Sequence, residues 1–405
     1  IFGAVFESTL NPETRRSGGM HYTSIENIHK VIDPLFMDEL NQEFEEICEI
    51  AVDRTRERRL HEFQHKLAGL IFLDPACGSG NFLTETYLSL RRLENEVLRV
   101  LKHGQITFGD ANWNPIQVSI SQFYGIEIND FAVTVAKTAL WIAESQMLKE
   151  TEKIVLMHLD FLPLKSYTNI IEGNALRIDW EDVVPKNELN YIMGNPPFVG
   201  YSLQSKSQKE DILSIYVDEK GKPYKTAGKI DYVSGWYWKA AQLMQGTAIR
   251  TAFVSTNSIT QGEQVAGVWK PLYERFDIHI DFAYRTFIWD SEASLKAHVH
   301  CVIVGFSIAL NPNARLLYTA ERFQEVENIS AYVVAADNVF IEARSKPICG
   351  VPILQNGGKP TEGGFLILSE EEKDNLIITE PQISPFVRPY MMGKDFIDRK
   401  PRYCL

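Results

Sequence analysis

Cysteine, basic residues and long apolar segments are all scarce in this sequence. The five cysteines among 405 residues are scattered without metal-ligand spacing, which indicates a reduced, cytoplasmic protein that needs no metal. No apolar run approaches the roughly 20 residues that span a membrane, and no signal peptide is visible, so we expect no membrane partner. The 41 lysines and arginines against 53 acidic residues give a net charge of −12, which argues against uniform coating of nucleic-acid phosphates.

The length and composition are those of an ordinary globular protein. A chain of 405 residues predicts two domains, or one large domain with an appendage. It begins at Ile1 rather than at methionine and stops at Leu405 within a continuing pattern, so we expect a fragment of a longer, monomeric protein. The negative charge leaves room for a local basic cleft, but it suggests that much of any DNA-binding surface lies elsewhere.

A glycine-rich turn between an apolar run and a helical pattern is the feature around which we organise the sequence. The run Leu70–Leu73 is short enough for a buried strand, and Asp74–Gly80 then reads Asp-Pro-Ala-Cys-Gly-Ser-Gly. Apolar residues recur at helical spacing from Phe82 to Val97. Strand, turn and helix form half of a nucleotide-binding unit, whose helix N-terminus favours an anionic group. A plain structural turn is the alternative, because two glycines after a strand are weak evidence alone.

A second motif, Gly-Asn-Pro-Pro-Phe at residues 194–198, ends another short apolar run. Proline cannot continue a central ladder, so the strand Tyr191–Gly194 stops there. The two prolines stiffen the turn and direct the Asn195 amide and the Phe198 ring off the strand end. Ligands of open α/β sheets bind at the carboxyl ends of strands, so we expect both motifs at one edge.

Glu127 ends the apolar strand Phe123–Ile128 and is predicted to lie at the same edge. An acid in this position can accept hydrogen bonds from both ribose hydroxyls of a nucleoside. An exposed strand-end carboxylate is the alternative interpretation.

The two motifs together resemble those of amino-methyltransferases that use S-adenosylmethionine (SAM). Their order, glycine-rich loop before Asn-Pro-Pro-aromatic, is that of gamma-class DNA adenine-N6 methyltransferases. In this class a His-Tyr-Thr segment also touches the amino-acid end of SAM; a helix cap at Thr23 or Ser24 is the alternative. The resemblance places an acceptor for the SAM adenine at Asn174, for which a turn asparagine is the alternative. The cofactor contacts expected in this way are His21, Tyr22, Thr23, Asp74, Ala76, Gly78, Gly80, Glu127, Ile128, Asn174 and Ala175.

Further blocks resemble a narrower group, the MmeI-like type IIL restriction–modification enzymes. They lie at 194–200, 231–236, 253–264, 285–293, 298–306 and 402–405. Members of this group carry a nuclease, a helical spacer, a methyltransferase and a target-recognition domain in one polypeptide. We find no Asp…Glu-x-Lys nuclease constellation before Arg15, so no nuclease activity is expected from these residues.

The fold class expected from this resemblance is α/β. It is a Rossmann-like SAM-dependent methyltransferase with a mostly parallel seven-stranded sheet, a helical N-terminal segment, and an antiparallel closing hairpin of Ile278–Ala283 and His298–Phe306. We expect a helical segment at 1–69, the catalytic domain at 70–310, and at 311–405 a bridge into a largely absent recognition domain. Residues 200–229 are predicted to be a long loop, either a lid or a disordered segment.

The resemblance implies methylation of N6 of an adenine flipped out of double-stranded DNA. Asn195 and Pro196 would accept the amine hydrogens, Pro197 would hold the turn, and Phe198 and Phe287 would stack on the base. Core packing in the hairpin loop is the alternative for Phe287. Methylation of a protein glutamine or an RNA base is a second enzymatic interpretation, and a non-catalytic SAM-binding module is a third.

Overall fold

The structure, a computed structural model, describes residues 23–103, 115–159, 169–289, 299–309, 314–319, 322–344, 346–353 and 363–405. The chain divides into two compact units, Ile1–Glu342 and Ala343–Leu405. Each unit is described by itself. Within the described residues, no helix has both the length and the apolar character needed to cross a membrane.

A mixed nine-stranded sheet forms the centre of the first unit, in the order β3-β2-β1-β4-β5-β7-β6-β8-β9. The strands are β1 (Phe72–Asp74), β2 (Phe123–Glu127), β3 (Ile170–Glu172), β4 (Tyr191–Gly194), β5 (Arg250–Thr256), β6 (His279–Trp289), β7 (Val299–Ser307), β8 (Arg315–Tyr318) and β9 (Phe323–Val326). The five strands β1 to β5 pair in parallel, and the order reverses between β1 and β4. This reversal creates the crevice in which sheets of this type bind ligands.

The far side of the sheet differs from the prediction. β7 pairs antiparallel with both β5 and β6, as expected for the two last predicted strands. These strands do not close the sheet, because β8 adds in parallel to β6 and β9 follows antiparallel to β8. The predicted count of seven strands was therefore wrong. The two additional strands are only four residues long, and they lie within the stretch 311–405 that we expected to be a bridge.

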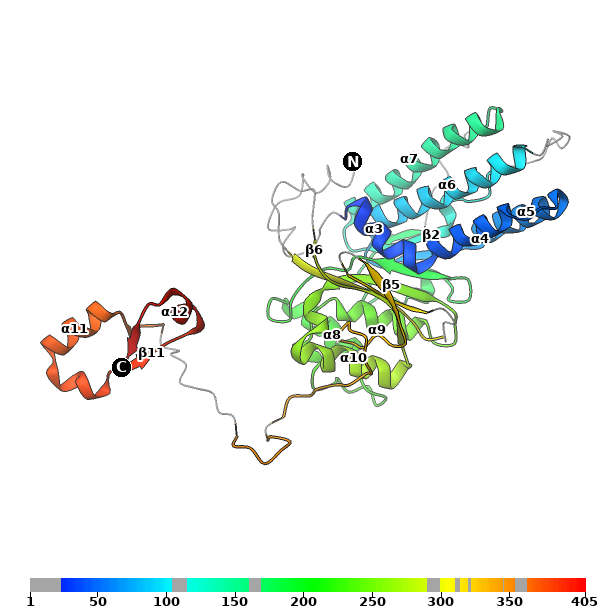
Figure 1. Cartoon of the computed structure of the whole chain (residues 1–405). Helices are drawn as coiled ribbons and strands as arrows, with labels where there is room; N and C mark the ends of the chain where they lie inside the picture. The colour runs from blue at the N-terminus through cyan, green and yellow to red at the C-terminus, as the bar shows by residue number, and fades with distance from the viewer. Residues whose placement is uncertain are drawn as a thin grey trace. The chain divides into compact units, whose positions relative to one another are not determined.

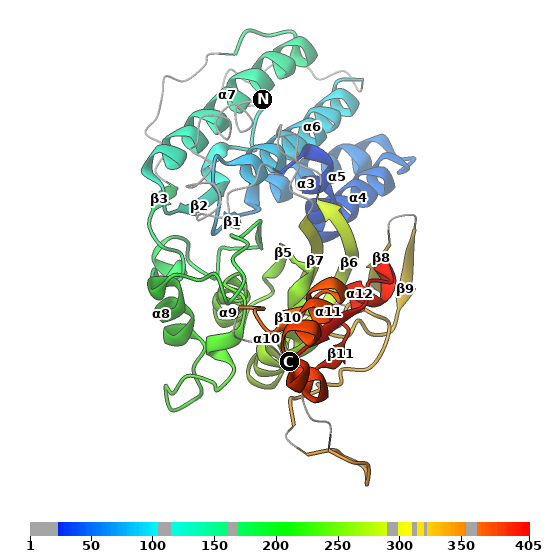
Figure 2. The same cartoon turned by 90° about the vertical axis from the view of Figure 1, so that its left-hand side faces the viewer.

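Helices cover both faces of the sheet (Figures 1 and 2). One face carries α3 (Ile25–Ile32), the π-helical turn η1 (Asp33–Met37), α4 (Asp38–Cys48), α5 (Asp53–Gly69), α6 (Asn81–His103) and α7 (Asp130–Val155). The other face carries α8 (Lys206–Ile215), α9 (Ser234–Leu243) and α10 (Gly262–Phe276), and short 3₁₀ turns lie at Ile120–Gln122, Trp180–Asp182, Ala227–Lys229 and Asn257–Thr260. Each helical layer packs on its own hydrophobic core, because the central strands are buried on both faces.

The periodicity predicted for α6 is confirmed, since the apolar residues from Phe82 to Val97 are buried against the sheet. The predicted loop at 200–229 was wrong in part, because it contains α8. Ser205 caps α8 in a capping box with Gln208, and Ile212 within the helix is fully buried. The many polar residues of this stretch obscured the helical pattern in the sequence. The helix is stabilised by its capped first turn and by the burial of Ile212.

The second unit contains a small antiparallel sheet in the order β10-β12-β11. Its elements are β10 (Ile367–Leu368), α11 (Glu370–Thr379), the 3₁₀ turn η6 (Pro381–Phe386), β11 (Arg388–Tyr390), α12 (Gly393–Asp398) and β12 (Arg402–Cys404). An ion pair of 2.6 Å between Arg402 and the buried Asp395 links α12 to β12. The divisions predicted at residues 69 and 310 remain predictions.

Candidate active site

The carboxyl ends of β1, β2, β3 and β4 bring the two sequence motifs to one edge of the sheet. The glycine-rich loop follows β1, and the Asn-Pro-Pro-Phe loop follows β4, its direct neighbour. Glu127 ends β2 on the other side of β1. Strand order alone therefore places these three features around the crevice between β1 and β4.

The glycine-rich loop depends on two glycines with positive φ, Gly78 at 53° and Gly80 at 81°. A Cβ atom on Gly80 would lie 2.9 Å from the Cβ atom of Ala136 in α7, so a side chain there would push the loop and the helix apart. On the opposite side, the indole nitrogen of Trp236 donates a 3.0 Å hydrogen bond to the carbonyl oxygen of Pro75. The loop is thus held between α7 and α9.

Glu127 is buried, with 8% of its surface exposed, and its two carboxylate oxygens are held by backbone groups. The amide of Gly78 donates to Oε2 at 2.9 Å, and the amide of Asn129 donates to Oε1 at 3.0 Å. Burial raises the pKa of Glu127, while backbone hydrogen bonds from Asn129, Gly78 and Ile128 oppose that rise. Each carboxylate oxygen can accept a second hydrogen bond, so the group can still bind hydroxyls.

Asp74 joins the two motif loops directly. Its Oδ1 accepts a 3.0 Å hydrogen bond from the amide of Ala76, and a Cβ atom on Gly194 would lie only 2.4 Å from this oxygen. Glycine at position 194 therefore lets β4 approach the carboxyl group of β1. Burial, helped by the nearby Glu127 charge and opposed by the Ala76 amide, raises the pKa of Asp74 from 3.8 to about 8.

Asn195 presents a free acceptor at this edge. Its Nδ2 donates a 3.3 Å hydrogen bond to Oγ1 of Thr23, which lies just before α3. Its Oδ1 is buried and has no hydrogen-bond partner among the described residues. A buried acceptor favours a hydrogen-bond partner, so this oxygen is available to a donor from a ligand. Pro196 is buried behind it, and Pro197 is partly exposed.

Asp231, a buried aspartate that sequence reasoning did not single out, holds the end of the Asn-Pro-Pro-Phe loop by hydrogen bonds. Asp231 Oδ1 accepts a 2.9 Å hydrogen bond from the amide of Tyr201, and its Oδ2 accepts a short one from the Ser258 hydroxyl. The neighbouring amide of Tyr232 donates to the carbonyl oxygen of Val199 at 2.9 Å. The exit of the Asn-Pro-Pro-Phe loop is therefore tied to α9 and to the segment after β5.

The two aromatic residues predicted to hold a base lie on different elements. Phe198 follows the two prolines and packs partly against the core of the α3–α7 layer. Phe287 lies in β6 opposite Cys301 of β7, so the predicted loop position of Phe287 was wrong. β6 continues to Trp289, which pairs with Val299 of β7, and its register against β7 shifts at two irregularities, between Ile280 and Phe282 and between Tyr284 and Phe287. The ammonium group of Lys30 lies 5.4 Å from the centre of the Phe287 ring.

Asn174 stabilises the turn after β3 by hydrogen bonds from both ends of its side-chain amide. Its Oδ1 accepts from the amide of Leu176 at 2.9 Å, and its Nδ2 donates to Asp211 of α8 at 3.0 Å. Asp211 also accepts from Arg177 at 2.6 Å and from the Tyr232 hydroxyl at 2.9 Å. These hydrogen bonds are those of the alternative interpretation, a turn asparagine, and the sequence gave no signal for Asp211.

The remaining predicted contacts divide into three kinds. His21 and Tyr22 lie outside the described residues. Ile128 follows Glu127 with 64% of its surface exposed, which leaves an apolar side chain at the site edge. Ala175 is buried, and its carbonyl oxygen accepts a 2.8 Å hydrogen bond from the Trp180 indole.

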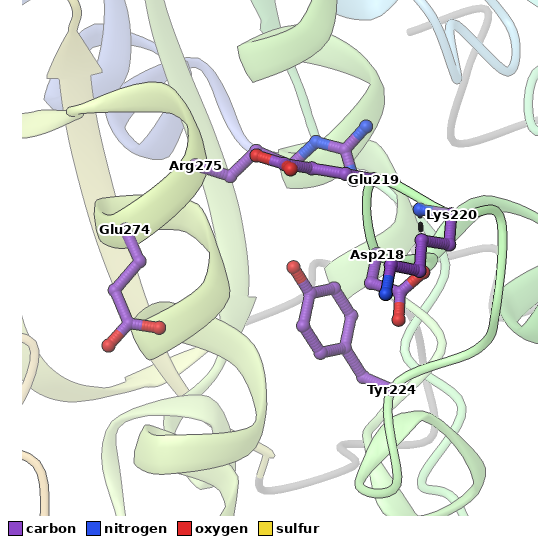
Figure 3. Close-up of a pocket in the computed structure, with 6 residues that line it drawn as sticks. All are labelled: Asp218, Glu219, Lys220, Tyr224, Glu274 and Arg275. Atoms are coloured by element: carbon purple, nitrogen blue, oxygen red, sulfur yellow. Dashed lines mark hydrogen bonds between the residues drawn. The ribbon is translucent and has the colours of Figure 1, made fainter.

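A hollow of about 350 Å³ lies elsewhere, between the turn after α8 and the end of α10 (Figure 3). It is lined by Asp218, Glu219, Lys220, Tyr224, Glu274 and Arg275. Acidic and basic side chains are mixed there, and none of the predicted site residues is among them.

Models of known protein families match two stretches of the sequence. A family model described as "MmeI, DNA-methyltransferase domain" matches residues 50–319. This chain belongs to the MmeI DNA-methyltransferase family. A second model, "MmeI, target recognition domain", matches residues 335–405 of this MmeI-family chain. The family resemblance expected from the sequence blocks is thus confirmed.

Two relatives cover the MmeI-family chain completely. DNA methyltransferase A of Bacillus subtilis (strain 168) is 40% identical over 408 residues, which are 100% of this chain and 45% of that protein. The type IIL restriction–modification enzyme MmeI, solved in complex with DNA, has a TM-score of 0.89 and 42% identity, covering 100% of this chain and 53% of that chain. This chain thus spans about half the length of these relatives.

Proposed function

We propose that this protein is a SAM-dependent DNA methyltransferase that modifies N6 of adenine within a restriction–modification enzyme. The observation that carries the proposal is the buried Oδ1 of Asn195, which has no hydrogen-bond partner in the part of the chain that the structure describes and follows β4, the neighbour of β1 with its glycine-rich loop. An amino group on a base is a donor, and this oxygen is an acceptor at the carboxyl edge where a base would have to enter.

The residues of the crevice fit SAM. Gly78 and Gly80 keep the loop after β1 tight and close to α7, so a ligand can approach its backbone. Glu127 offers a buried carboxylate for ribose hydroxyls, and Ile128 offers an exposed apolar side chain beside it. SAM would supply a methyl group that is already activated on a sulfonium.

The contribution of the protein side chains to the reaction is to prepare the target amine. The adenine amine is conjugated with its ring and is a poor nucleophile. Asn195 Oδ1 and the backbone carbonyl of Pro196 would each accept one amine hydrogen, which bends the nitrogen towards tetrahedral geometry and frees its lone pair. The same acceptors stabilise the positive charge that develops on the nitrogen. Phe198 and Phe287 would stack on the flipped base, and the proton would leave after transfer.

We infer DNA as the substrate class from the family, and the net charge of the chain bears on how that DNA is held. The MmeI relative was solved with DNA, and a target-recognition model matches 335–405. We propose that 70–310 catalyse and that 311–405 lead into recognition. With a net charge of −12, this chain should depend on that recognition module for phosphate and base contacts.

Two other functions remain testable. A protein-glutamine or RNA amino-methyltransferase would use the same Asn-Pro-Pro-aromatic loop, but the recognition match favours DNA. A non-catalytic SAM-binding module would have no need of an acceptor such as Asn195 Oδ1 at the crevice.

The product of the reaction is the direct test. We expect the purified protein, expressed from its complete reading frame, to convert deoxyadenosine in duplex DNA into N6-methyldeoxyadenosine and to form no 5-methylcytosine. A C5 reaction needs a cysteine nucleophile, and residues 194–200 contain none. Nucleoside mass spectrometry, with RNA and total protein as parallel substrates, would measure this. A product on RNA or protein alone would reject the proposal.

Cofactor binding provides a second prediction. Glu127→Ala should weaken SAM binding at least about tenfold, because two hydrogen bonds to a charged group are lost. Isothermal titration calorimetry would compare it with Glu172→Ala, which removes the exposed carboxylate paired with Glu127 on the neighbouring strand β3. Equal affinities for both variants would remove Glu127 from the SAM site.

A further inference from the structure

We propose that Thr23 is a positioning residue for Asn195, holding its amide so that the carbonyl oxygen faces the target amine. This inference rests on the proposed function. Thr23 has 3% of its surface exposed, and its Oγ1 accepts the 3.3 Å hydrogen bond from Asn195 Nδ2. The other end of the same amide, Oδ1, is the buried atom without a partner among the described residues.

The chemistry of an amide makes its orientation important. Its nitrogen donates and its oxygen accepts, so a reversed Asn195 would present hydrogens to the hydrogens of the incoming amine. An oxygen acceptor at the Nδ2 end satisfies that donor and leaves Oδ1 available. The Thr23 hydroxyl supplies such an acceptor within the buried surroundings of the loop.

Thr23 can do this because α3 fixes its position. Ser24 caps the helix by accepting from the amide of Asn27, and Ile28, Val31 and Ile32 are buried beneath it. α3 packs against α6, β5 and β7, so it is anchored to the same sheet that carries Asn195. The last turn of this helix carries Lys30, whose ammonium group lies over Phe287. The segment from Thr23 to the end of α3 thus contacts both the Asn195 amide and the Phe287 ring.

This role differs from the SAM contact implied by family resemblance. A residue that only binds cofactor changes the affinity for SAM and leaves the rate at saturating SAM unchanged. A residue that orients Asn195 changes the rate of methyl transfer once both substrates are bound. The two roles can therefore be told apart by two measurements. Cofactor binding is measured by the dissociation constant of SAM, and orientation of Asn195 is measured by the single-turnover rate.

The test compares Thr23→Val, which removes the hydroxyl at nearly constant shape, with Thr23→Ser, which retains it. We expect Thr23→Val to lower the single-turnover rate at saturating SAM and DNA about tenfold, with SAM affinity within about threefold of the wild type. Thr23→Ser should restore most of the rate. Ser24→Ala is the matched control, because it weakens the cap of α3 without touching the Thr23–Asn195 hydrogen bond.

A second readout does not require turnover. The side-chain amide signal of Asn195, assigned by its loss in Asn195→Asp, should shift in Thr23→Val and return in Thr23→Ser. An unchanged signal, an unchanged rate in Thr23→Val, or weakened SAM binding at an unchanged rate would overturn the inference. If the wild type methylates no DNA, the proposed function fails, and the amide signal still tests the contact.

Discussion

Replacing Asn195 by alanine should lower the rate of methyl transfer roughly 10²–10³-fold, the loss typical when one preorganised hydrogen-bonding group is removed from a transition state. The expected cause is loss of Oδ1, the buried acceptor for which the described residues provide no hydrogen-bond partner. SAM affinity should stay close to that of the wild type, because the proposed cofactor contacts, Gly78, Gly80 and Glu127, belong to other loops. Single-turnover kinetics and calorimetry on the same preparations would measure both quantities.

Asn190→Ala provides the matched control for this experiment. Asn190 lies just before β4, at the opposite end of the strand, where its Oδ1 accepts a 2.8 Å hydrogen bond from the amide of Ile71. Its loss should lower thermal stability and leave the rate per folded molecule unchanged. A rate for Asn195→Ala within threefold of the wild type would contradict the proposed mechanism.

The ionisation of Asp74 should make the thermal stability of the ligand-free protein depend strongly on pH. Burial raises the pKa of Asp74 from 3.8 to about 8 in the folded protein, so between these values the folded state holds a proton that the unfolded state has lost. The contribution of the protonated Asp74 carboxyl to the free energy of unfolding is complete below pH 4 and is lost as the pH rises through about 8. Asp74→Asn cannot ionise, and its Oδ1 can still accept from the Ala76 amide.

Ligand-free Asp74→Asn should therefore melt above the wild type at pH 8, by roughly 5 °C, and the difference should shrink towards pH 5. Differential scanning calorimetry across this range would measure it. Asp182→Asn, an exposed aspartate in the turn Trp180–Asp182, is the control and should follow the wild-type curve. Parallel curves for Asp74→Asn and the wild type would show that the Asp74 carboxyl does not carry this proton.

The sequence by itself determined the features that are local along the chain. The strand before Asp74, the two glycines after it and the helical spacing from Phe82 to Val97 each act within a few residues, so they predicted β1, its turn and α6 correctly. Proline chemistry ended β4 at Gly194 in the same way. Because parallel strands share one carboxyl edge, these local features also predicted that the two motifs lie at the same edge of the sheet.

Tertiary structure decided what depends on distant partners. Thr23 and Asn195 are 172 positions apart, and no spacing rule connects them; packing of α3 on the sheet brings them together. Asp211 carries no signal in the sequence, and Asp231 stands out only as part of the block 231–236; burial beside the loops that they bind gives both a role. The added strands β8 and β9 are too short to predict from their own residues. They form because β6 offers its free edge to β8, an interaction that exists only after the sheet has assembled.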